Sequence, residues 1–194
     1  DLFDSSNELA DKYNFEDLQK WLEGLGIDIS PKLFGTIFAF TKQFEQYYPD
    51  NPNRSVERRK LYKELGKELT LSNILDANAA ECAEIAALAQ FYLQDKTPSE
   101  YISGDVLWKK EHEFSEPHSF LRIKDRNKTY LYDPANPTST TGGNFPSIYT
   151  TEANFDEEIR QNQKRFVTAK NLIGNKEAYF GVSDGTDIRE KHIV

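Results

Sequence analysis

The spacing of apolar residues along the chain changes from a helical repeat to short strand-like runs. In the first third, three stretches place apolar residues three or four positions apart, which is the repeat of an amphipathic helix. These stretches begin near residues 14, 31 and 55. The second opens with Ser30-Pro31, and serine as N-cap with proline at the first helical position is a strong start signal. The N-terminal third is therefore predicted to be helical.

A further helix is predicted over the alanine-rich run that begins at residue 79. One stripe of this helix holds Cys82, Ile85, Ala86, Ala89 and Leu93. The stripe has the spacing of a face that packs on other structure, and its small alanines allow a close approach. Cys82 lies at the N-terminal end of that face.

The second half of the chain holds short runs of β-formers bounded by polar or turn residues. We expect strands at 106–113, 118–124, 128–133, 165–170 and 178–182. The polar residues between the second and third runs predict a β-hairpin. Helices first and strands later predict an α+β fold, with a mostly antiparallel sheet of about five strands packed against the alanine-rich helix.

Residues 134–151 are rich in Pro, Ser, Thr and Gly and are predicted to form a loop after the hairpin. Its length favours either a mobile lid beside a site or a plain surface connection. A short helix is expected after this loop, capped by Thr151 and including Phe155 and Ile159.

Three residues at the ends of these elements have the chemistry of a catalytic site. Cys82 is the only cysteine, His118 opens one strand of the predicted hairpin, and Asp133 closes the other. The two hairpin residues face each other if the turn is centred between residues 125 and 126. A register shift of one or two residues leaves them diagonal neighbours, still within side-chain reach.

Each of the three residues also has an ordinary structural explanation. Free cysteine is often a small apolar filler in a core, a histidine often ends a strand, and Asp-Pro often opens a turn. Together, a thiol, an imidazole and a carboxylate are a nucleophile, its general base and the group that orients the base. The helix N-terminus favours the thiolate of Cys82, whereas Glu81 and Glu84 oppose it.

In order and local sequence these residues resemble the transglutaminase-like superfamily of papain-type cysteine enzymes. The matching pieces are 81–88, 117–121 and 130–136, and the aromatic-rich strand that ends in Asp-Pro-x-Asn is the most distinctive. The resemblance covers residues 75–180 approximately. Ala80 stands where the family usually has glycine two residues before the cysteine.

The resemblance implies a papain/transglutaminase-like catalytic core over residues 71–194, with a helical region over 1–70 packed on it or extending it. It implies Cys82, His118 and Asp133 as catalytic residues that act through a thioester. Donors to the oxyanion are expected from the backbone N–H of Cys82 and from the side chain of Asn78 or Asn73.

Compact members of this superfamily include protein-glutamine deamidases, among them secreted bacterial toxins and effectors. The resemblance therefore implies deamidation of a glutamine in a protein substrate, by an effector acting in host cytoplasm. Two alternatives stay open for an active enzyme: a cysteine peptidase or amidase, and a transglutaminase. A third alternative is a catalytically inactive protein-binding domain, which the alanine at position 80 and the glutamate at position 81 keep open.

Composition narrows the partners and cofactors. The net charge of −8 argues against nucleic acid, whose phosphates would be repelled. No apolar run approaches the roughly 18–20 residues that span a bilayer. No Gly-rich phosphate loop or paired metal-ligand spacing occurs, so no cofactor is expected. A basic cluster over residues 54–63 predicts either a docking patch for an acidic partner or a solvated helix face.

Overall fold

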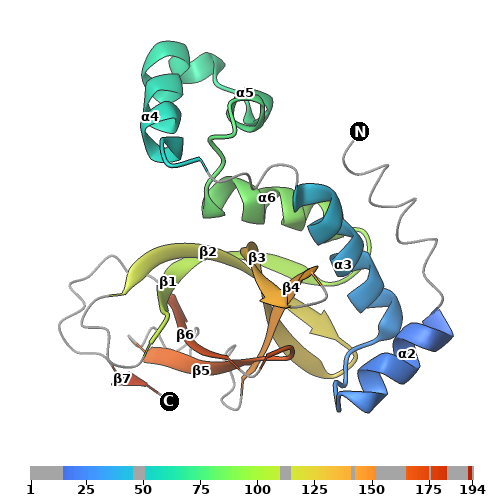
Figure 1. Ribbon diagram of the computed structural model, residues 1–194. Coiled ribbons are helices and arrows are strands. Elements are labelled where there is room, and N and C mark those ends of the chain that lie inside the picture. Colours follow the sequence, from blue (N-terminus) through green and yellow to red (C-terminus); the bar gives the residue numbers. More distant parts are fainter. Residues whose placement is uncertain are drawn as a thin grey trace.

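The structure is a computed structural model, in which residues 15–45, 51–109, 115–140, 143–151, 165–174, 176–182 and 192–193 are described. Its helices precede its strands in the chain (Figure 1). The helices are α2 (Phe15–Gly24), α3 (Pro31–Phe44), α4 (Arg54–Leu65), the 3-10 helix η2 (Gly66–Glu68), α5 (Leu71–Asp76) and α6 (Cys82–Leu93). The strands are β1 (Ser99–Leu107), β2 (Glu116–Asp125), β3 (Lys128–Thr140), β4 (Gly143–Thr151), β5 (Arg165–Asn171), β6 (Glu177–Val182) and β7 (His192–Ile193).

Local signals in the sequence set the starts of two helices. The Ser30 side chain accepts a hydrogen bond from the backbone N–H of Leu33, so α3 begins at Pro31 as predicted. Helix α6 begins at Cys82, at the N-terminal end of the predicted apolar stripe. The short helix expected around Phe155 and Ile159 lies outside the described residues, as do residues 110–113 of the expected first strand.

Strands β1 to β6 form a closed antiparallel barrel. Their order is β4-β3-β2-β1-β6-β5, and β4 also pairs with β5, which joins the two ends of the sheet. Strand β7 adds a short parallel pairing to β5. Closure pairs the edges of the sheet with each other and so removes them.

The barrel corrects the predicted fold. The α+β class is compatible with the structure, but the expected papain/transglutaminase-like core with a mostly antiparallel sheet of about five strands is wrong, because six strands close on themselves. The barrel strand missing from the prediction is β4, which lies in the segment predicted to be a loop, as does the second half of β3. Strand β1 runs over Ser99–Leu107 and overlaps the strand expected at 106–113 only at its end. A register shift in β3 between Asp133 and Thr138 accommodates the prolines there.

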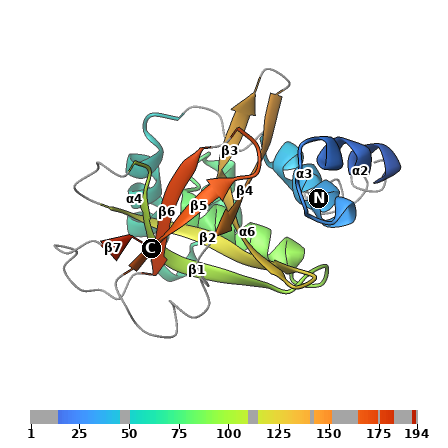
Figure 2. The same ribbon diagram turned by 90° about the horizontal axis from the view of Figure 1, so that it is seen from below.

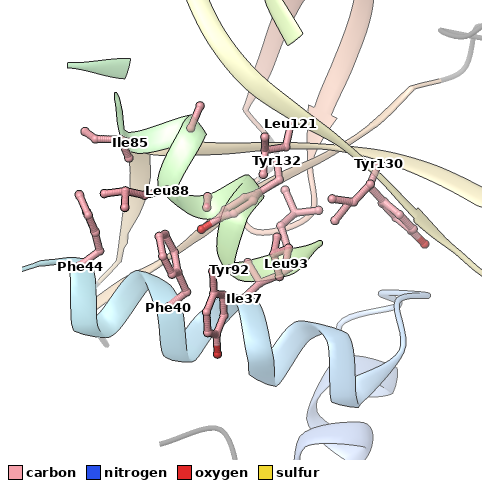
Figure 3. Close-up of a cluster of buried hydrophobic side chains, with 14 of the residues drawn as sticks. Ile37, Phe40, Phe44, Ile85, Leu88, Tyr92, Leu93, Leu121, Tyr130 and Tyr132 are labelled. Atoms are coloured by element: carbon pink, nitrogen blue, oxygen red, sulfur yellow. The ribbon is translucent and has the colours of Figure 1, made fainter. Parts of the chain in front are cut away.

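Alternation along the strands separates two apolar cores. One lies inside the barrel and includes Phe120, Tyr149 and Phe180. The other lies between the outer face of β2 and β3 and the helices α3 and α6 (Figure 3). In β4, Ile148 belongs to the outer core and Tyr149 to the inner one, as expected for neighbours on a strand. Figure 2 shows α2 and α3 beside the barrel, next to β3 and β4.

The hairpin of β2 and β3 forms with a register shifted by two residues. Leu121 faces Tyr132, and the turn is the pair Arg126-Asn127, with Arg126 in the left-handed region at a φ of 56°. Continuing the same register places Asp133 opposite Phe120. Asp133 is therefore a diagonal neighbour of His118, which is the arrangement that a shifted register was expected to produce.

Among the described residues, no helix is both long enough and apolar enough to cross a membrane.

Candidate active site

Cys82 is the first residue of α6 and is half-buried. A reciprocal capping box holds the helix start: the Glu81 side chain accepts from the backbone N–H of Glu84, and the Glu84 carboxylate accepts from the N–H of Glu81 at 3.0 Å. The first backbone N–H groups of a helix have no acceptor within the helix and project outward from its N-terminal end. The thiol thus lies at a rigid, positively polarised helix end.

His118 and Asp133 form a buried pair at one end of the barrel. The ring Nε2 of His118 lies 2.9 Å from Oδ2 of Asp133, and the two residues are 7% and 1% exposed. The carboxylate acts on the ring through this close polar contact and through its charge. The Asp133 carboxylate is itself held by two donors, the backbone N–H of Ala135 at 3.2 Å and Asn136 Nδ2 at 3.0 Å.

The three side chains are coupled electrostatically. Burial of the Cys82 thiol raises its pKa, but the hydrogen bonds from His118 and from the backbone N–H of Ser119, with the charge of His118, outweigh burial and lower the pKa of Cys82. Burial lowers the pKa of His118, and the contacts with Asp133 and Cys82 outweigh it and raise the pKa to about 10. The two shifts favour a thiolate beside an imidazolium.

The thiol opens into a cleft of about 460 Å³. Its walls come from five parts of the chain: residues at and just before the start of α4, the start of α6, the residue after β1, the start of β2 and the middle of β3. The lining includes Asn51, Ser55, Cys82, Trp108, His118 and Asn136. The Cys82 thiol is therefore accessible from the cleft.

Polar contacts tie α4 to the start of α6 at the edge of the cleft. Ser55 Oγ donates to Glu81 Oε1 at 2.6 Å, and Arg58 Nε donates to Glu84 Oε1 at 3.0 Å. Arg58 also lies 3.6 Å from Glu81 Oε2. The two glutamates that flank Cys82 thus carry a compensating positive charge, which the sequence did not indicate. The side chains of Arg59 and Lys63 on α4 are exposed.

The structure brings Cys82, His118 and Asp133 together, but it places the two asparagines elsewhere. The Asn73 side chain closes a capping box with Thr70 at the start of α5. Asn78 is exposed, with a φ of 50°, and its carbonyl oxygen accepts from Asn51. Neither asparagine lines the cleft, so the geometry gives the oxyanion prediction for Asn73 and Asn78 no support.

Two site residues were missed by sequence reasoning. Asn136 holds the Asp133 carboxylate, and its signal was the asparagine of the Asp-Pro-x-Asn motif. Trp108 packs edge-on against the His118 ring with centroids 5.5 Å apart, and its Nε1 donates to Glu116 Oε2 at 3.1 Å. No local signal identified Trp108, because it lies just beyond β1 and reaches His118 only through strand pairing.

Within the part of the chain that the structure describes, no group of three or more His, Cys, Asp or Glu side chains is arranged to hold a metal ion. The reactive or hydrogen-bonding groups available in the cleft are the thiol of Cys82, the imidazole of His118 and the backbone N–H groups at the start of α6.

Comparison with known proteins returns no match to this chain among family models, curated proteins or solved structures.

Proposed function

We propose that this protein is a cysteine hydrolase that deamidates a glutamine side chain of a protein substrate through a thioester. The observation that supports it is the coupled pair in the cleft: the pKa of Cys82 is lowered while that of His118 is raised to about 10. A buried apolar filler needs no such pair. A thiol that acts as a nucleophile near neutral pH needs a neighbouring group that stabilises its ionised form.

In the proposed reaction the Cys82 sulfur bonds to the δ-carbon of the glutamine, and the carbonyl oxygen takes the negative charge. The backbone N–H of Cys82 stabilises this oxyanion. The C–N bond then breaks, His118 gives its proton to the nitrogen, and ammonia leaves. Because Nε2 faces Asp133, the proton is transferred from Nδ1.

Water completes the cycle. His118, now neutral, takes a proton from the water that attacks the thioester carbon, and the C–S bond breaks to give glutamate and the Cys82 thiolate. Asp133 keeps the ring oriented and stabilises its protonated form in both halves of the reaction.

The shape of the cleft favours a side-chain amide. Asn51, which precedes α4, and Ser55 of α4 line the cleft together with Trp108 and His118. A glutamine side chain on its flexible stem can enter such a cleft end-on, whereas a main-chain amide must bring the chain on both sides of it. The resemblance to effector-type deamidases directs the search for a substrate to proteins of a host cytoplasm.

The first experiment tests whether Cys82 is a nucleophile. Iodoacetamide should alkylate the protein near neutral pH much faster than it alkylates a free cysteine, and His118→Ala should remove the excess. Equal rates for the native protein and free cysteine would instead support the inactive binding-domain alternative.

The second experiment identifies the reaction. Eukaryotic cell lysate is treated with the native protein or with Cys82→Ala, and intact proteins and peptides are compared by mass spectrometry. Deamidation adds about one mass unit to a glutamine and frees ammonia, because an amide nitrogen is replaced by oxygen. Fragments would support a peptidase, and Gln–Lys cross-links a transglutaminase; either result rejects the deamidase.

A further inference from the structure

A second hollow opens at the same end of the barrel as the catalytic cleft. It encloses about 660 Å³ and is lined by residues of β3, β4, β5 and β6 and by the two residues that follow β1. Ligand sites are commonly found in the mouths of barrels, with volumes of about 300–1,000 Å³. The hollow therefore has the place and the size of a binding site.

The hollow has a polar floor beside the apolar interior of the barrel. Asn171 Nδ2 donates to Thr138 Oγ1 at 2.8 Å, and Thr138 Oγ1 lies 2.8 Å from Ser147 Oγ. These three side chains are 3%, 9% and 2% exposed, whereas the interior beyond them is Phe120 and Phe180. Burying polar side chains costs free energy even when they are paired. Ser147 Oγ also donates to the carbonyl oxygen of Asn136, and Asn171 Oδ1 accepts from the backbone N–H of Ile173. The floor therefore presents a polar but internally paired surface to a ligand.

The hollow and the catalytic cleft share two lining residues. Trp108 and Asn136 line both, and each also contacts the catalytic residues: Trp108 packs on His118, and Asn136 donates to Asp133. A peptide with one side chain at Cys82 can therefore reach the hollow by crossing Trp108 and Asn136, which separate the two.

The charged lining of the hollow is mostly basic. It consists of Lys109, Lys176 and Glu177, and both lysines are exposed at the rim. The cleft at Cys82 instead includes Arg54 together with Glu81 and Glu116. In a chain of net charge −8, a basic rim beside the active site favours an acidic group on the ligand.

We infer that the hollow is a second substrate subsite, which takes an acidic side chain of the protein segment next to the target glutamine. The carboxylate lies at Lys109 and Lys176, and the peptide polar groups face the floor of Thr138, Ser147 and Asn171. This inference rests on the proposed function, since it names the sequence context of the glutamine.

Binding is measured without turnover to separate the two claims. The protein carries Cys82→Ala and Trp21→Phe, so that Trp108 is the only remaining tryptophan and reports on both hollows. The probes are capped peptides with one glutamine and one glutamate placed one to four residues before or after it. Matched peptides carry serine instead of glutamate.

At the correct spacing, the glutamate peptide should bind roughly three- to tenfold more tightly than its serine match, and the preference should shrink at high salt. Lys109→Gln with Lys176→Gln should remove the preference and leave binding of the serine peptide unchanged. The control Lys20→Gln with Lys67→Gln removes the same charge from exposed positions of α2 and η2 and should keep the preference.

Equal binding of glutamate and serine peptides at every spacing would overturn the subsite, as would equal losses in the two double variants. Ammonia release from the same peptides by the protein with its native cysteine tests the proposed function separately. Turnover without any acidic preference rejects only the subsite. Selective binding with no turnover of any peptide supports the subsite and rejects the deamidase.

Discussion

Arg58 of α4 and Glu84 of α6 form an ion pair two residues beyond Cys82. Arg58 Nε lies 3.0 Å from Glu84 Oε1, and the side chains are 24% and 8% exposed. Glu84 also caps the helix that begins at Cys82. The pair thus joins α4, whose residues are otherwise unburied, to the helix that presents the thiol.

Removing this ion pair should weaken the attachment of α4 to α6 and raise the pKa of the Cys82 thiol. Arg58→Gln leaves the Glu84 carboxylate without its cation, which should lower the free energy of unfolding by about 1–3 kcal/mol. Alkylation of Cys82 near neutral pH should also slow, because Glu81 and Glu84 then face the thiolate uncompensated. Urea unfolding and iodoacetamide kinetics measure the two effects. Arg59→Gln, an exposed neighbour with the same charge change, should alter neither; identical behaviour of the two variants would contradict this account.

The coupled pKa shifts predict different pH profiles for two reactions of Cys82. Because the pKa of Cys82 is lowered from 9.0, alkylation should reach its plateau at a lower pH than a free thiol does. Ammonia release should fall as pH rises through about 10, where His118 loses the proton that the leaving nitrogen needs. Alkylation needs no proton donor and should not fall there. A common alkaline limb for both reactions would show that His118 is not the acid.

The charge of Asp133 should account for much of the shift at His118. Asp133→Asn keeps the shape and the acceptor for the N–H of Ala135 but removes the charge, so the pKa of His118 should fall from about 10 toward 6.5. Ammonia release at neutral pH should drop roughly 10²–10⁴-fold, the range for losing a positioned acid–base group. Titration of the His118 ring by NMR measures the pKa directly. The exposed substitution Asp95→Asn is the control and should leave both quantities unchanged.

Barrel closure should depend on a glycine in β1. A Cβ on Gly104 would lie 2.1 Å from the backbone oxygen of Gly181 on β6 and 3.1 Å from the Phe120 ring. Because backbone cannot yield as a side chain does, Gly104→Ala should cost about 1–3 kcal/mol or more of unfolding free energy. At Gly24, in α2, the same Cβ meets nothing within 4 Å. Gly24→Ala should therefore be neutral or stabilising by up to about 1 kcal/mol, because alanine favours helix. Similar unfolding curves for both variants would contradict the close packing of β1 on β6.

The candidate site was largely predictable because its three residues lie on two local elements, a helix and a hairpin. Cys82 begins a helix, and His118 and Asp133 lie on one hairpin, so periodicity and turn chemistry were enough to place them. The observed hairpin register is shifted by two residues from the one in which His118 and Asp133 face each other, and their side chains still reach each other diagonally. The oxyanion prediction lacked any such local signal, and Asn73 and Asn78 are used instead in a cap and a turn.

The fold was harder to predict because its decisive contacts are distant in sequence. The prolines and glycines of residues 134–151 are typical of a loop, yet this segment forms the end of β3 and all of β4. The gain from pairing β4 with both β3 and β5 outweighs the weak local preference, since an unpaired sheet edge leaves backbone groups without partners.

By itself, the sequence determined that a helix begins near Cys82 and that a hairpin carries His118 and Asp133. It also determined the order of thiol, imidazole and carboxylate along the chain. Only the tertiary structure decided that the sheet closes into a barrel, that Arg58 offsets Glu81 and Glu84, and that Trp108 stands between two hollows. The physical reason is that capping, turn chemistry and periodicity act over a few residues. Strand closure and charge compensation depend on segments that meet only when the whole chain folds.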